Sequence, residues 1–479
     1  MKKKIFLPLL AALVLLGVLG GLVGYRIYQT QFIDLGEDRY RLDISELDRS
    51  NRSADYLSLI PEFTRLKTLD LRGSGLTVDE YDQLRSQLPD CEILWDIPFQ
   101  GKFYPQDTAE IEVTSLSQVD RLTLEYFPQL KSVLAAQCPD YAQLDLLRQT
   151  HPDWKIEYYV PVCGKYYRYD TANLTITAGD VQDLIPVLPY LPNLQSVKFV
   201  SPRSSAEDLL TFRQENPRIQ VSWHLNFHGV PLDDSAESLD FTGIRTSVEE
   251  IEALIPYLPN LTRLDLSDCG ISNEVLDALN KKYESIKIVW AVYLSGWFRV
   301  KTDITTFMPV KHGYYPRGDG LKDLRYCNDI IALDVGHMKI SNCDFVAYMP
   351  HMQYLILADT PVSDLTPLTG LKELIYLEIF MTRVTDYTPL LTCTALQDLN
   401  LCFTFGSYET IMQMTWLKTL WWSKTLEYHF TYAQRQTIQA ALSNTYCNLD
   451  YGSSTSRGWR DLPNYFAQRD LHGMYYMTG

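Results

Sequence analysis

The sequence lacks the short motifs by which common enzymes are recognised. It contains no HExxH helix, no GxSxG nucleophile turn, no P-loop and no GxGxxG phosphate loop. Its eight histidines are dispersed, and no Cys–His or Ser–His pairing can be argued from their positions. We therefore expect no catalytic residue, no cofactor and no metal. An enzyme with an unrecognised site remains one alternative.

The chain also lacks an excess of basic residues and any paired-cysteine motif. It carries 59 Asp and Glu against 43 Lys and Arg, a net charge of −16, which argues against a nucleic-acid partner. The same charge argues against lying flat on anionic lipid. The nine cysteines include no CxxC and no zinc-type grouping, so we expect few or no disulfides.

Long apolar stretches are scarce, and the longest stands at the start of the sequence. Residues 5–24 are uncharged and mostly apolar, long enough for a helix to cross a bilayer, and Lys2 to Lys4 precede them. The lysines should stay in the cytoplasm. We expect residues 1–28 to be an uncleaved signal anchor, followed by a linker over 29–38. A cleaved signal peptide is the alternative.

What the sequence does contain is repetition, first at a spacing of about 64 residues over 39–316. Each long copy has an apolar strand, a short amphipathic helix, a second alternating strand and a glycine, which we expect to supply a bend or a positive φ. The predicted helices span 78–88, 141–150, 206–215 and 273–283. The second strands run over 93–99, 156–162, 221–227 and 288–294, ahead of Gly101, Gly164, Gly229 and Gly296.

Two sets of side chains in the long copies invite a functional reading. Trp95, Tyr158, Trp223 and Trp290 could stack on sugars, but they share a strand face with Ile and Val and are better interpreted as core. Asp107, Asp170 and Asp234 follow the glycines at a similar offset. They offer too few oxygens for calcium, so turn formation is the better interpretation.

A tighter repeat of 22 residues covers 317–426. Residues 355–374 read LILADTPVSDLTPLTGLKEL and residues 377–396 read LEIFMTRVTDYTPLLTCTAL, with threonines recurring at Thr360, Thr382, Thr404 and Thr425. In the long copies, Ser74, Cys138 and Cys269 hold the corresponding place. An apolar pair at a fixed period predicts an α/β leucine-rich repeat solenoid with parallel strands on its concave face.

The 22-residue block resembles the internalin-type leucine-rich repeat of bacteria, although threonine replaces the more usual asparagine. Together with the longer Trp-containing repeats and the N-terminal anchor, the sequence resembles leucine-rich surface proteins of Gram-positive bacteria. The resemblance implies a cell-membrane protein, single-pass, with its C-terminal domain extracellular. It also implies a binding role, with a protein or a cell-wall polymer as partner.

The predicted binding residues stand beside the leucines of the tight block, where side chains point out from the strands. Several are aromatic, as is common at protein interfaces. The predicted partner-binding residues are Tyr354, Ile356, Tyr376, Glu378, Phe380, Asn400, Phe403 and Trp421, with Asp398 in the same row. The alternative is that residues 427–479, which leave the period, fold back and cover this row.

Residues 427–479 should therefore form a C-terminal cap, with a helix over 433–443, or else a ligand-binding tail. Trp459, Arg460, Tyr465, Phe466, Arg469 and Asp470 suggest a compact cap containing an ion pair. The sequence as a whole predicts a membrane-anchored leucine-rich repeat protein that binds a partner. A structural component of an envelope complex, with no separate ligand, remains open.

Overall fold

A computed structural model of the chain describes residues 32–34, 40–43, 67–423, 430–450 and 458–473. The chain divides into two compact units, residues 1–225 and 226–479, and each is described by itself. Across the described residues, no helix combines the length and apolar character needed to cross a bilayer. The expected anchor over 5–24 lies outside the described residues, as does Thr425, and both stay predictions.

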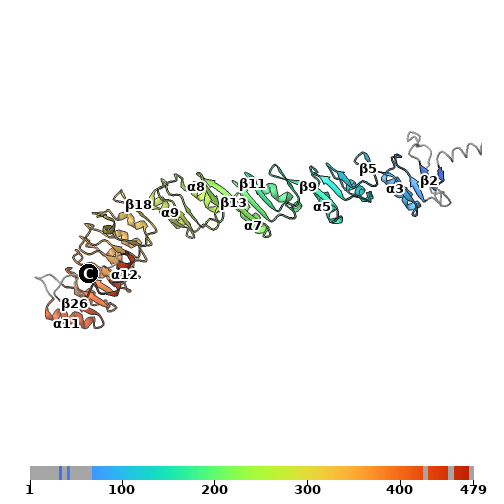
Figure 1. The fold of residues 1–479 in the computed structure, drawn as a ribbon. Helices are drawn as coiled ribbons and strands as arrows, with labels where there is room; N and C mark the ends of the chain where they lie inside the picture. Colours follow the sequence, from blue (N-terminus) through green and yellow to red (C-terminus); the bar gives the residue numbers. More distant parts are fainter. Residues whose placement is uncertain (1–31, 35–39, 44–66, 424–429, 451–457, 474–479) are drawn as a thin grey trace, which may run out of the picture. The chain divides into compact units, whose positions relative to one another are not determined.

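The second unit contains a parallel seven-stranded sheet, coloured yellow to red in Figure 1. Its strands are β20 (Thr306–Phe307), β21 (Ala332–Asp334), β22 (Tyr354–Ile356), β23 (Tyr376–Glu378), β24 (Asp398–Asn400), β25 (Thr419–Trp421) and β26 (Tyr446–Asn448). In β21 to β25 the central leucine of each strand pairs with that of the next: Leu333, Leu355, Leu377, Leu399 and Leu420. All five are fully buried, so the predicted ladder is confirmed.

Short helical turns return the chain from one strand to the next and close the core behind the sheet. They are η8 (Asp344–Tyr348), η9 (Thr366–Leu368), η10 (Thr388–Thr392), α10 (Tyr408–Ile411) and α11 (Tyr432–Ala441). The last of these lies close to the helix predicted over 433–443. Prolines stand in the first turn of η9 and η10, where a missing N–H does no harm.

The threonine ladder satisfies backbone groups inside this core. The hydroxyls of Thr360, Thr382 and Thr404 each donate to the carbonyl three residues earlier, at 2.6, 2.7 and 2.6 Å respectively. In the first long copy Ser74 makes the same bond to Leu71. Threonine thus fulfils here the hydrogen-bonding role expected of the ladder position.

The long repeats contain the expected strands and helices. The four predicted helices are α3 (Val78–Gln87), α5 (Tyr141–Thr150), α7 (Ala206–Glu215) and α9 (Asn273–Lys282). Parallel strands flank them: β2 (Tyr40–Asp43), β3 (Thr68–Asp70), β4 (Glu92–Leu94), β7 (Glu110–Glu112), β8 (Ser132–Ala135), β9 (Lys155–Val162), β11 (Asn173–Thr177), β12 (Ser196–Val200), β13 (Gln220–Phe227), β15 (Ser238–Asp240), β16 (Arg263–Asp265) and β17 (Lys287–Val289). The remaining short elements are β1 (Phe32–Asp34), α4 (Gln118–Thr123), η3 (Leu124–Tyr126), α6 (Val181–Leu184), η4 (Ile185–Tyr190), α8 (Val248–Leu254), η5 (Ile255–Tyr257), η6 (Pro309–His312) and η7 (Lys322–Tyr326).

The recurring glycines of the long copies have the predicted positive φ and sit in hairpin turns. Their φ values are 77°, 77°, 88° and 79°, and the residue before each also has a positive φ. Two consecutive positive φ angles match the tight turn that joins antiparallel strands. The returning strands are β6 (Lys102–Pro105) beside β5 (Asp96–Phe99), β10 (Lys165–Arg168) beside β9, β14 (Val230–Asp233) after β13, and β19 (Phe298–Lys301) beside β18 (Ala291–Leu294).

The aromatic residues of the long copies are core, as predicted. Trp95, Tyr158, Trp223 and Trp290 are all 2% exposed or less, and the ring of Tyr81 stacks on Trp95. The aspartates after the glycines form no metal cluster, since none with three acidic, His or Cys ligands occurs in the described part of the chain.

We expect Thr382→Val to destabilise the tight block by about 1 kcal/mol, because the carbonyl of Ile379 loses its hydroxyl donor and keeps only the longer 3.4 Å bond from the Thr382 backbone N–H, while the side-chain volume is kept. Denaturant unfolding followed by circular dichroism measures the change. Thr385→Val, at an exposed position of the same repeat, is the control and should change stability by less than about 0.5 kcal/mol. Equal stability of the two variants would show that the ladder hydroxyl contributes nothing.

Candidate functional site

The predicted binding residues lie on one face of the tight-block sheet, which we call the strand face. It carries the side chains that flank each central leucine, together with those just after the strands. Sequence analysis expected them to be exposed, and that expectation is wrong. The predicted residues that are no more than 8% exposed are Tyr354, Ile356, Tyr376, Glu378, Phe380, Asn400 and Trp421. Phe403 is half-buried.

The C-terminal residues 458–473, which we call the clasp, cover the strand face. Its helix α12 (Pro463–Leu471) lies beside the strands of the tight block in Figure 1. Trp459 and Tyr465 enter one apolar cluster with Tyr376 and Trp421, and Trp459 is fully buried there. The alternative in which the C-terminal segment folds back over the aromatic row is therefore the one observed.

A glycine allows the clasp to approach the sheet closely. Gly458 has a φ of 101°, a conformation that side-chain-bearing residues rarely adopt. A Cβ atom there would stand 3.0 Å from the ring of Trp421. Replacement of Gly458 would therefore strain the backbone where the clasp meets β25.

The polar contacts between clasp and strand face follow one pattern. Three acidic residues of the face accept hydrogen bonds, and three residues of the clasp donate them. Trp459 Nε1 donates to Glu378 Oε1 at 2.8 Å, and Asn464 Nδ2 donates to Asp398 Oδ2 at 2.7 Å. Arg469 Nη1 forms an ion pair with Asp334 Oδ2 at 3.4 Å, so this arginine pairs with the repeats, whereas the sequence suggested an ion pair within the cap.

Burial raises the pKa of ionisable groups on the strand face. Removal from water raises the pKa of Glu378, whose carboxylate also accepts a hydrogen bond from the Tyr376 hydroxyl. The pKa of Tyr376 lies well above its usual value because of burial and the neighbouring carboxylate. Burial likewise raises the pKa of Asp334. Hydrogen-bond donors or cations near these buried carboxyl groups therefore stabilise their charged form.

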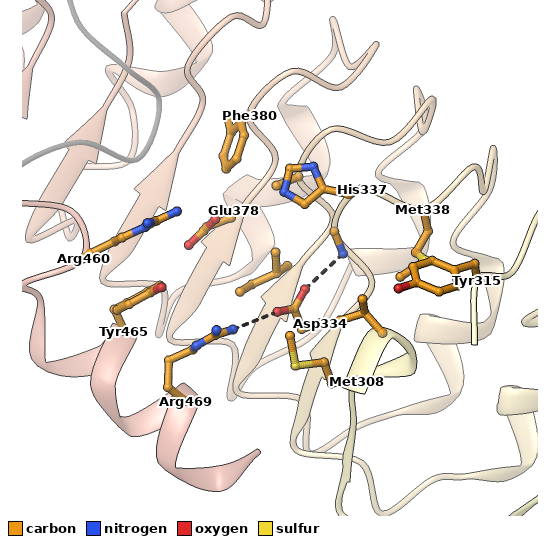
Figure 2. Close-up of a pocket in the computed structure, with 14 residues that line it drawn as sticks. Met308, Tyr315, Asp334, His337, Met338, Glu378, Phe380, Arg460, Tyr465 and Arg469 are labelled. Carbon is orange, nitrogen blue, oxygen red and sulfur yellow. Dashed lines mark hydrogen bonds and ion pairs between the residues drawn. The ribbon is translucent and has the colours of Figure 1, made fainter. Parts of the chain in front are cut away.

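Part of the strand face stays open as a pocket of about 230 Å³ (Figure 2). It lies where β21, β22 and β23 end, between these strands and the clasp. Strand-face side chains Ile356, Glu378 and Phe380 line it, and all three belong to the predicted binding set. The other five predicted residues do not line it. Whether any of the eight binds a partner stays a prediction.

The residues that complete this pocket were not among the predicted partner-binding residues, although Arg460, Tyr465 and Arg469 were named for a C-terminal cap or ligand-binding tail. They are Met308, Val310, Tyr315, Asp334, His337 and Met338 from the repeats, with the clasp residues Arg460, Tyr465 and Arg469. Asp334 had a usable signal, because it precedes Ile356 by 22 residues and so occupies the same outward register position. The clasp residues had none, because no repeat fixes where a non-repeating segment lies.

Trp459→Ala should release the clasp. The substitution removes a fully buried ring and the donor to Glu378, so we expect a loss of about 3–5 kcal/mol in the stability of the clasp. Limited proteolysis and hydrogen exchange should show residues 458–473 opening while the leucine ladder stays protected. Trp297→Ala, at a position 64% exposed, is the matched control. Unchanged protection of α12 would contradict the proposed anchoring role.

His472 should make the clasp sensitive to acid. Burial, with the nearby positive charges of Arg469 and Lys311, lowers the pKa of His472 to about 4. An unfolded histidine titrates near 6.5, so the unfolded clasp gains a proton first as the pH falls below that value. Titration of His472 therefore lowers clasp stability progressively between about pH 6.5 and pH 4, by about 3 kcal/mol in all.

The measurement is hydrogen exchange of α12 in the unmodified chain and in His472→Gln, compared at the same pH. The stability difference between the two chains should fall by about 2–3 kcal/mol from pH 7 to pH 4.5. Asp334 and Glu378 are common to both, so their own titration cancels. A difference that does not change with pH would show that His472 does not titrate in this way.

Comparisons with known proteins show similarity to other leucine-rich repeat proteins and little beyond it. No family model matches the chain, and no curated protein matches it. Internalin C2 of Listeria monocytogenes is 17% identical, with 59% of this chain and 83% of that chain covered and a TM-score of 0.20. The Listeria monocytogenes internalin inlF is also 17% identical, with 74% and 91% covered and a TM-score of 0.24. A leucine-rich repeat protein of Leptospira interrogans is 14% identical, with 81% and 91% covered and a TM-score of 0.23.

Proposed function

We propose that this chain is an extracytoplasmic leucine-rich repeat protein, anchored by residues 5–24, that binds a protein or cell-envelope partner. The partner engages the open part of the strand face, at the pocket between the ends of β21–β23 and the clasp. The observation that carries the proposal is this pocket, which combines aromatic, apolar and charged side chains where the rest of the face is covered.

The composition of the pocket supports a binding role. Binding sites combine an apolar lining with a few placed polar groups, and the pocket has both. Tyr315 is 64% exposed and the His337 side chain is 72% exposed, so a partner can reach them without moving the clasp. Tyrosine is among the residues that dominate binding energy at protein interfaces.

The membrane anchor and the extracellular placement rest on the sequence alone. The apolar run of 5–24, with three lysines before it, supports an orientation in which the repeats lie outside the cytoplasm. Protease added to intact cells should digest the repeats if this orientation is correct. Full protection of the repeats until the cells are lysed would overturn it.

A structural role is the second candidate, and the clasp favours it. The clasp buries most of the aromatic strand face, which is the surface that sequence analysis offered to a ligand. In that case the chain would copurify with an envelope complex through contacts elsewhere, and changes at the pocket would have no effect. The two candidates are therefore separated by variants of the pocket rim.

The test is cross-linking capture from native envelopes with the full chain as bait. We expect the double variant Tyr315→Ala with His337→Ala to capture the partner at least about ten-fold less well, because interface anchors contribute about 2 kcal/mol or more. Both side chains are largely exposed, so the fold should survive, and circular dichroism checks this.

Tyr348→Ala with His351→Ala is the matched control. Tyr348 is 54% exposed, and His351 pairs with Glu373 at 2.9 Å as His337 pairs with Asp359 at 2.9 Å, but neither residue lines the pocket. Loss of capture in the pocket variant alone supports the proposed site. Equal capture by both variants would support the structural role instead.

A further inference from the structure

The pocket is small and carries opposite charges on different walls (Figure 2). Its volume of about 230 Å³ lies below the range of about 300–1,000 Å³ that holds drug-sized ligands. A ligand that fills it is therefore of the size of a single amino acid or a little larger. The chemistry of each wall of the pocket indicates which class of ligand of this size fits.

The floor of the pocket is acidic. Asp334 is 8% exposed, and its carboxylate accepts from the Gly336 amide at 3.1 Å. Its contact with Arg469 is long, at 3.4 Å, and Arg469 lies at the edge of the floor in Figure 2. Glu378 also lines the pocket, at the end of β23, which is two strands away from the end of β21 at Asp334. A ligand cation placed over this floor would offset the cost of burying the two carboxylates.

The wall formed by the clasp is basic. Arg460 reaches toward Glu378 from the side of the pocket in Figure 2, and its charge lowers the pKa of that carboxyl against the effect of burial. A guanidinium is suited to a ligand carboxylate because its donors match the two oxygens. The pocket thus offers a site for an anion a short distance from the site for a cation.

The third wall is apolar. Met338 and the ring of Tyr315 lie on the side away from Arg460 in Figure 2, and Met308 and Val310 also line the pocket. Phe380, which follows β23, lines the pocket beside Glu378 and His337. Methionine side chains adapt to ligands of different shape, so this wall suits an aliphatic group without selecting a single one.

We propose that this pocket binds a small zwitterion, an α-amino acid with an apolar side chain or a peptide little longer. The ammonium group lies over Asp334 and Glu378, the carboxylate faces Arg460, and the aliphatic side chain packs on the methionine wall. This inference rests on the proposed function, since it assigns the chemistry of the group that enters the same pocket.

Isothermal titration calorimetry on the full chain in mild detergent tests the inference with L-leucine. Leucinamide lacks the carboxylate, and N-acetyl-leucine lacks the ammonium group. We expect leucine to bind at least about ten-fold more tightly than either analogue, because each analogue lacks one of the two charged groups that match the pocket walls. These comparisons use the unmodified protein and do not depend on how variants fold.

A zwitterionic ligand could be a free amino acid or a short peptide, and the dipeptide glycyl-leucine distinguishes the two. Tighter binding of leucine assigns the site to free amino acids, and tighter binding of the dipeptide assigns it to short peptides such as those of a cell wall. Either result supports the inference, provided that leucinamide and N-acetyl-leucine remain weak. Binding of all four compounds with equal affinity, or of none, would overturn it.

Two charge-removing variants locate the ligand groups. Asp334→Asn should weaken leucine binding at least about ten-fold and affect N-acetyl-leucine little, whereas Arg460→Gln should weaken leucine and leave leucinamide nearly unchanged. Asp386→Asn and Arg383→Gln, at exposed positions of the neighbouring repeat, are the matched controls. Hydrogen exchange of α12 would show whether Asp334→Asn loosens the clasp. If it does, Arg460→Gln and the binding of leucinamide and N-acetyl-leucine to the unmodified chain still test the inference.

The envelope capture described above distinguishes the two proposals. If pocket variants lose the partner while leucine and glycyl-leucine fail to bind, the zwitterion inference falls and the proposed binding site stands. If leucine binds as expected while the pocket variants still capture the partner, the pocket is a ligand site but not the partner site, and the proposed function falls.

Discussion

The short, in-register strand is the constraint on which the rest of this structure depends. Each strand of the tight block has only three residues, so its stability comes from the neighbouring repeats rather than from itself. The central leucine turns inward and builds the ladder core. The two flanking residues must turn to the opposite face, because side chains alternate along a strand. The sequence of the repeat therefore decides what the strand face carries, and with it what must cover that face.

The strand face carries both aromatic rings and carboxylates, so its cover must satisfy both. Trp459 does this with one side chain, since its ring packs near Tyr376 and its N–H donates to Glu378. Asn464 and Arg469 supply the remaining donors on one helix. A purely apolar cover would leave buried carboxylates unpaired, which is costly. The arrangement is that of an amphipathic helix in a groove, supplied here by the same chain.

The repeating parts could be predicted from the sequence, because one residue type recurs at one register position. The leucine ladder, the threonine bonds and the four helices of the long copies follow from periodicity and are confirmed. For the glycines the sequence predicted a bend or a positive φ; the positive φ is confirmed, but the antiparallel hairpins were not predicted. Their turns pair Gly101, Gly164, Gly229 or Gly296 with Gln, Cys, His or Ser, and so lack the Asn-Gly or Asp-Gly signal of such turns.

The candidate site was only partly predictable, for a physical reason. Periodicity identifies which side chains leave the core, and this gave Ile356, Glu378 and Phe380. It does not identify what lies over them, because docking of the clasp depends on contacts between residues far apart in sequence. Trp459 and Glu378 are 81 residues apart, and Arg469 and Asp334 are 135 apart. No local pattern records either pair.

The rim of the pocket unites the repeating and non-repeating parts. The residue that turns the chain after each strand has a positive φ and recurs every 22 residues, as His337, Asp359, Met381 and Phe403. His337 and Asp359 also hydrogen bond along this column at 2.9 Å. The repeats thus fix one side of the pocket rigidly, while the clasp alone supplies Arg460 and Arg469. Changes in the clasp sequence can therefore alter which charge the pocket accepts without disturbing the solenoid, because the ladder core does not depend on those residues.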